Sequence, residues 1–273
     1  MIVVATLVCA VLAALSMWLV LRTPLSTPSL CRTNFRGNRI PAIAGVVVVL
    51  IAAAGSLVLL AVSESIDSEV SFAGFQAAAG FGVLGLLDDL GADSSGGGFR
   101  GHLRALRRGK VTTGLLKMGG GGLVAAMTAG LITSGGVAGW VRDTLFIALA
   151  ANLANLFDRA PARTTKVAVL VFVGLAASTA LAPEVAIAAL VVGAAAGLAP
   201  FELGEHLMQG DTGVNVIGAL LAVSAVVVTP PVGLWIALVV VAGLNVLSEK
   251  VSFSKVIAAN PVLRAIDMTG RAV

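Results

Sequence analysis

Long apolar stretches recur along the whole chain, and they constrain its fold more than any other feature of the sequence. Windows of roughly 17 to 23 apolar residues, bounded by charges, prolines or glycine clusters, have the length of a helix that crosses a bilayer. The sequence predicts about nine such helices, at 2–21, 42–63, 71–87, 114–134, 138–156, 167–182, 184–199, 214–230 and 232–247. The sixth and seventh are also short enough to form one re-entrant pair.

The composition excludes a soluble domain. Hydrophobic residues make up 58% of the chain and charged residues only 12%, whereas about 25% of an ordinary soluble protein is charged. The 32 glycines, many of them inside apolar stretches, favour close helix packing in lipid over the strands of a barrel. The predicted fold class is therefore all-α, a polytopic membrane helical bundle, with residues 1–247 as one transmembrane domain and 248–273 as a cytoplasmic tail.

Basic residues lie almost entirely on one side of this predicted bundle. If the N-terminus is outside, all of the 18 Lys and Arg residues except Arg142 fall in inner loops or in the tail. Because short loops rich in Lys and Arg stay in the cytoplasm, the sequence predicts an external N-terminus and a cytoplasmic C-terminus. The positive face favours anionic lipids or substrates and gives no reason to invoke nucleic acid.

Paired acids end the third predicted helix. Asp88 and Asp89 lie at its C-terminus, where the helix dipole is unfavourable for two carboxylates, so a cation is the natural neutraliser. An acid at the end of a membrane helix is costly unless it is paired or has a function. The alternative is that the two acids are solubilising charges at a helix end.

A polar stripe ends the fifth predicted helix. Asn152, Asn155 and Asp158 are spaced three residues apart, which keeps them near one helical face, and we expect them to point into one site. The alternative is that the stripe joins neighbouring helices through hydrogen bonds.

A third cluster opens the eighth predicted helix. Asp211 and Thr212, between Gly210 and Gly213, suit an N-cap position, and capping alone would explain them. The free backbone N–H groups there also suit a phosphate or a carboxylate that binds a metal ion. In the predicted orientation, all three clusters arrive at the cytoplasmic face.

The acids of the three clusters favour a hard cation. Asp88, Asp89, Asp158 and Asp211 supply only oxygen ligands, which suits Mg²⁺ rather than zinc. Arg104, in the basic loop 96–110, and Lys117 lie nearby in the sequence and suit an anionic headgroup or a diphosphate. The alternatives are an ordinary inside-positive loop for Arg104 and a snorkelling side chain for Lys117.

Taken in order, these motifs resemble those of the polyprenyl-phosphate N-acetylhexosamine-1-phosphate transferases, or glycosyltransferase family 4. This family includes phospho-N-acetylmuramoyl-pentapeptide transferase. The segments that carry the resemblance are Asn-Phe-Arg-Gly-Asn-Arg-Ile-Pro at 34–41, Gly-Leu-Leu-Asp-Asp at 85–89, Thr-Gly-Leu-Leu-Lys at 113–117, Asn-Leu-Ala-Asn-Leu-Phe-Asp at 152–158 and Gly-Asp-Thr-Gly at 210–213.

The resemblance implies transfer of a sugar-1-phosphate from a UDP-sugar to a polyprenyl phosphate at the cytoplasmic face of a bacterial inner membrane. The reaction would use Mg²⁺ and release UMP. By residue match, Asp211 would bind the metal with Asp88 and Asp89, and one of this pair would orient or deprotonate the lipid phosphate. The substrate-binding set would comprise Lys117, Asn152, Asn155, Asp158, Arg104 and Asn34. A homodimer is left open.

Two departures from the family pattern keep other functions open. Asp158 is followed by Arg159, where the family usually has glycine, and the last two predicted helices are joined only by 229–231 instead of a long inner loop with histidines. The main rival is a catalytically altered member that binds polyprenyl phosphate or a partner protein without transferring sugar. A transporter is the third class, but it would place its acids near the middle of the membrane.

Overall fold

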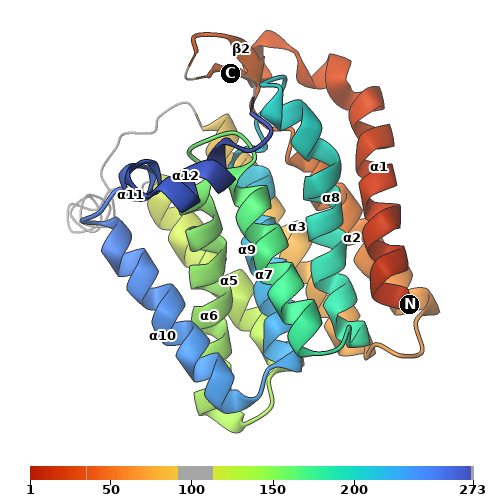
Figure 1. Ribbon diagram of the computed structural model, residues 1–273. Coiled ribbons are helices and arrows are strands. Elements are labelled where there is room, and N and C mark those ends of the chain that lie inside the picture. Colours follow the sequence, from red (N-terminus) through yellow and green to blue (C-terminus); the bar gives the residue numbers. More distant parts are fainter. Residues whose placement is uncertain (35, 92–112, 272–273) are drawn as a thin grey trace.

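The computed structural model describes residues 1–34, 36–91 and 113–271, and in the helix that begins at residue 113 the side chains are described from residue 118 onward. The long helices are α1 (Ile2–Leu25), α2 (Val46–Val62), α3 (Ser68–Leu90), α5 (Thr113–Ile132), α6 (Gly136–Phe157), α7 (Arg163–Ser178), α8 (Ala186–Leu203), α9 (Gly210–Val228) and α10 (Pro231–Ser248). The shorter elements are η1 (Pro28–Leu30), β1 (Cys31–Thr33), β2 (Arg39–Pro41), η2 (Pro183–Val185), α11 (Phe253–Ala259) and α12 (Pro261–Met268). The described part of the chain is thus an all-α bundle with one small hairpin (Figure 1).

Proline marks the start of two helices near the C-terminus. Pro231 and Pro261 occupy the first positions of α10 and α12, where the missing N–H costs nothing and the fixed φ suits a helix. Asn260 caps α12, because its side chain accepts hydrogen bonds from the backbone N–H groups of Val262 and Leu263.

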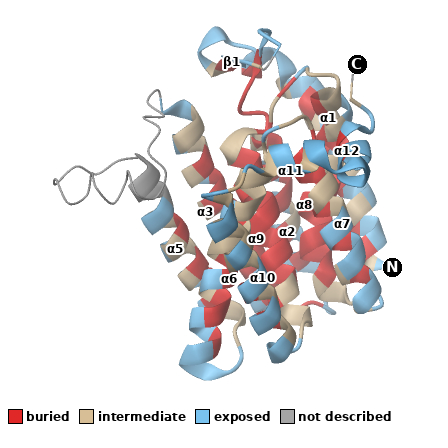
Figure 2. Ribbon diagram, turned by 60° about the vertical axis from the view of Figure 1, so that its left-hand side comes forward, coloured by how far each residue is buried: buried red, intermediate tan, exposed pale blue. Residues whose placement is uncertain are grey.

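The centre of the bundle is α9. It packs against α2, α3, α6, α7 and α8, and its residues from Thr212 to Ser224 are buried. Helix α8 is similarly enclosed, with α1 on one side and α9 on another. In contrast, α10 carries many exposed residues (Figure 2). They include the large apolar residues Trp235 and Ile236, as expected of a helix that faces lipid.

Each of the nine predicted ranges falls on a helix of its own. The ranges 167–182 and 184–199 correspond to the separate helices α7 and α8, with η2 between them. Within the described residues, six helices are long and apolar enough to cross a membrane, namely α1, α3, α6, α8 with η2, α9 and α10. The lengths and apolar composition of these helices confirm the prediction of a membrane-type helical bundle.

Basic elements gather at one end of the bundle. The hairpin of β1 and β2, in which Arg32 pairs with Ile40, lies at the end opposite residue 1, and α11 and α12 lie toward that same end (Figure 1). Arg142, the residue assigned to the other side, is buried and forms an ion pair of 2.7 Å with Asp143. Its charge is therefore compensated locally.

The C-terminal segment, predicted as a tail, is docked against the helix ends. The ring of Phe253 stacks on that of Phe157 at the end of α6, with 5.1 Å between centroids. Asp267 of α12 forms a bidentate pair with Arg163 at the start of α7, with N···O distances of 2.8 and 2.9 Å. These contacts hold α11 and α12 beside the polar clusters described next.

Candidate functional site

A glycine sets the distance between α3 and α9. At Gly85 a Cβ atom would overlap the backbone oxygen of Asp211 and lie 2.6 Å from the nitrogen of Thr212. Because Asp88 and Asp89 follow Gly85 by three and four residues, they share its face of α3. The close approach at Gly85 therefore brings the paired acids to the first turn of α9.

Asp89 caps α9 from the neighbouring helix. Its Oδ1 accepts a hydrogen bond from the backbone nitrogen of Asp211 at 3.0 Å, and its Oδ2 accepts from the nitrogen and the hydroxyl of Thr212 at 2.9 and 2.6 Å. A carboxylate is favourable at a helix N-terminus, where backbone donors lack partners within the helix. The interpretation of Asp211 and Thr212 as caps is wrong. The N-cap residue of α9 is Gln209, and its side chain makes no capping hydrogen bond.

Asp211 turns toward α6 instead. Its Oδ2 accepts a hydrogen bond of 3.0 Å from Nδ2 of Asn155. This contact fixes the carboxylate in one orientation and joins the second and third predicted clusters. The two clusters therefore meet through Asn155 and Asp211.

Asp158 completes the acidic group. It follows α6 directly and is partly buried. Burial raises the pKa of its carboxyl to about 6, and the negative charge of Asp89 adds to this shift, while Arg159 and Arg163 oppose it. The acids at the ends of α3 and α6 thus lie close enough to influence one another.

Asn152 does not join this group. Its Nδ2 donates a hydrogen bond of 2.6 Å to Oδ1 of Asn245 on α10, and Nδ2 of Asn245 donates to the carbonyl of Leu149 at 3.1 Å. The expectation that all three residues of the stripe point into one site is therefore wrong for Asn152. Its contact is the helix-joining hydrogen bond that the sequence left as the alternative.

Three other predicted substrate-binding residues lie elsewhere or are not described. Asn34 shapes the β1–β2 loop, since its Oδ1 accepts from the backbone nitrogens of Arg36 and Asn38, and its Nδ2 donates to Glu205. Lys117 lies on α5, but its side chain is outside the described part of the chain, and Arg104 lies wholly outside it.

The acids do not form a ready metal cage. Among the described residues, no group of three or more His, Cys, Asp or Glu side chains is placed to hold a metal ion. Mg²⁺ usually needs only one or two carboxylates, together with water and substrate phosphates. The predicted site with four carboxylates is therefore not assembled. The oxygen donors around Asp211 fit the mode of binding in which water and substrate phosphates complete the coordination shell.

Sequence reasoning missed a buried network behind the site. Glu202, at the end of α8, is only 4% exposed. Its Oε2 accepts a hydrogen bond of 2.7 Å from Nε2 of Gln209, which also donates to Oγ1 of Thr165 at 2.9 Å. The rule that singled out Asp88, an acid at the end of an apolar helix, would have found Glu202 as well.

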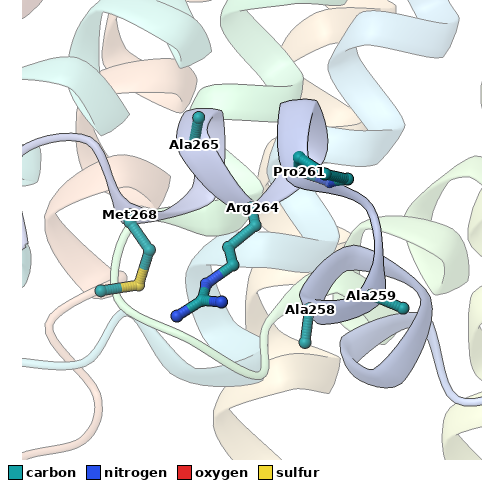
Figure 3. A pocket seen from close by; sticks show the side chains of 6 residues that line it. All are labelled: Ala258, Ala259, Pro261, Arg264, Ala265 and Met268. Atoms are coloured by element: carbon teal, nitrogen blue, oxygen red, sulfur yellow. The ribbon is translucent and has the colours of Figure 1, made fainter.

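The C-terminal segment also carries a shallow pocket, about 390 Å³ in volume. It is lined by Ala258, Ala259, Pro261, Arg264, Ala265 and Met268, with Arg264 extending between Met268 and Ala258 (Figure 3). None of these residues belongs to the acidic group.

No protein-family model matches the chain, and no curated protein matches its sequence.

Proposed function

We propose that this protein is a Mg²⁺-dependent transferase that moves a sugar-1-phosphate from a UDP-sugar to a polyprenyl phosphate and releases UMP. The observation that supports this best is the meeting of Asp89, Asn155, Asp158 and Asp211 at one end of the bundle. These residues come from two of the motifs of the resembled family and from part of a third. Their neighbours at that end are rich in Lys and Arg.

The arrangement suits phosphoryl transfer, which depends mainly on positioning and on neutralising negative charge. In this proposal Asp211, oriented by Asn155, holds Mg²⁺ together with the phosphates of the substrate. When bound, the ion would neutralise charge on the transferred phosphoryl group. Asp89 accepts three hydrogen bonds that stabilise α9. In this proposal Asp88, the neighbouring acid of the same motif, is assigned to the lipid phosphate.

We further propose that all nine long helices cross a bacterial inner membrane, with the acidic group facing the cytoplasm. The expected result for a tag fused to the C-terminus is that it resists labelling by an impermeant reagent in intact cells and becomes labelled after lysis. The reason is the positive charge of the loops and the tail at this end. Labelling of intact cells would contradict this orientation, and a tag at the N-terminus serves as the accessible control.

The transfer is tested by measuring UMP release from the purified full-length protein with Mg²⁺, polyprenyl phosphate and a panel of UDP-sugars. We expect release that requires both the lipid and Mg²⁺, and that falls about tenfold or more in Asp88→Asn, because a positioning carboxylate is lost. The exposed acid Glu249, replaced by Gln, is the matched control. Absence of release across the panel would contradict the proposal.

A second candidate function is binding of polyprenyl phosphate without transfer. It is favoured by the contacts of Asp89, whose carboxylate occupies backbone donors of α9 that could otherwise bind a phosphate. The same assay separates the two functions. Measurable binding of the lipid with no UMP from any donor would favour the second.

A further inference from the structure

A cluster of cations surrounds a single carboxylate where the C-terminal segment meets α7. Arg163 binds both oxygens of Asp267, and its Nη1 donates to the hydroxyl of Ser254 at 2.9 Å. Nζ of Lys166 donates to the backbone oxygen of Asp267 at 2.6 Å, and Nη2 of Arg271 lies 2.7 Å from its Oδ1. Three positive side chains therefore converge on one acid.

This cluster holds more donors than its acceptor can use. The Nε atom of Arg271 is buried and has no hydrogen-bond acceptor among the described residues. The Nη2 atom is also buried, and although it forms an ion pair of 2.7 Å with Oδ1 of Asp267, the two atoms do not meet in hydrogen-bond geometry. Nε and Nη2 form one edge of the guanidinium, the edge that pairs with two oxygens of a carboxylate or phosphate. A buried donor without an acceptor, such as Nε of Arg271, is rare in proteins and calls for an explanation.

Nearby acids have other partners. Glu205 pairs with Nε of Arg36 at 2.8 Å, and Glu202 accepts from Gln209. The carboxylate of Asp267 carries one charge and two oxygens, whereas a phosphoryl group carries up to two charges and three terminal oxygens. A phosphoryl group would satisfy this set of cations more completely than Asp267 does.

We propose that Arg163, Lys166 and Arg271 form a binding site for a phosphoryl anion, and that Asp267 fills this site as an internal substitute until such an anion displaces it. The ligand is a phosphate or diphosphate group, carried either by a soluble molecule or by a lipid headgroup. Its arrival releases Asp267 and loosens α12 from the start of α7. The inference is independent of sugar transfer, because it concerns binding alone.

The first test measures binding of inorganic diphosphate by calorimetry, with the full-length protein in neutral phosphatidylcholine nanodiscs. Asp267→Asn removes the competing charge but keeps the size of the side chain, so diphosphate should bind at least about tenfold more tightly than to the wild type. Glu249→Gln, which removes an exposed acid from the same segment, should leave the affinity unchanged. Adding Arg163→Gln to Asp267→Asn should abolish the gain.

Equal affinity in the wild type and Asp267→Asn, or a gain that survives Arg163→Gln, would overturn the proposal and leave Asp267 as a structural anchor. A second measurement needs no variant. In the wild type, saturating diphosphate should speed tryptic cleavage after Arg264 several-fold by releasing α12, and an unchanged cleavage rate at saturation would also overturn it.

The source of the anion is decided by repeating the calorimetry in nanodiscs that contain phosphatidylglycerol. If a lipid headgroup is the natural ligand, the anionic lipid should suppress diphosphate binding to Asp267→Asn. If the ligand is soluble, the affinity should match that in neutral nanodiscs. Either result keeps the site and assigns its occupant.

Discussion

The variant Asp211→Asn is expected to lower UMP release about a thousandfold or more while leaving the protein folded. Loss of a metal-binding carboxylate removes several kcal/mol of charge stabilisation from the transition state, and about 4 kcal/mol corresponds to a thousandfold change in rate. Asparagine keeps an oxygen that accepts from Asn155, as Oδ2 of Asp211 does at 3.0 Å. The fold should therefore survive, and the melting temperature in detergent checks this.

The matched control for this variant is Asn152→Ala. Asn152 belongs to the same predicted motif but bonds to Asn245 on α10, so its loss should lower the rate by no more than a few-fold. Activity of Asp211→Asn near that of the wild type would refute the assignment of the metal to Asp211. An equal loss in both variants would show that the contact between α6 and α10 matters as much as the acidic group.

The number and order of the long helices could be predicted from the sequence because both follow from the lengths of apolar stretches. The length of a bilayer-spanning helix and the charges that bound it are local properties. The boundaries shifted by a few residues, as at α3, which ends at Leu90 instead of 87. That shift keeps Asp88 and Asp89 inside the helix and aligns them with Gly85.

The side to which each polar residue points could not be predicted. In a helix that is apolar on all faces, hydrophobic periodicity does not identify the buried face. The motif at 152–158 placed its three polar residues on one face, but Asn152 pairs with α10 while Asn155 pairs with α9. Likewise, capping of α9 by Asp89 joins residues more than 100 positions apart, and no local signal reports such a contact.

The docking of the C-terminal segment against α7 could not be predicted from the sequence for the same reason. Arg163 and Asp267 are separated by 104 positions, and each taken alone is an ordinary surface charge. Only the fold shows that they form a buried pair beside the acidic group.

The variant Gly85→Ala is expected to disrupt the site, although Gly85 itself takes no part in the proposed chemistry. An added methyl group would collide with the backbone of α9 at Asp211 and Thr212, which cannot rotate away as a side chain can. Overpacking costs about 1 to 3 kcal/mol, so the melting temperature should fall by roughly 5 to 10 °C at the upper end of that range. Transfer activity and lipid binding should fall as well, because Asp88 and Asp89 move away from α9.

Gly174→Ala on α7 is the matched control, since nothing lies within 4 Å of a Cβ atom at that position. Alanine favours the helix over glycine by about 0.5 to 1 kcal/mol, so this variant should melt at or above the wild-type temperature. Equal melting temperatures for Gly85→Ala and the wild type would mean that α3 and α9 are not held together as tightly as the contact at Gly85 requires. A lower temperature with full activity would separate stability from the position of the acids, and would place the catalytic geometry under the control of Asn155 and α6 instead of α3.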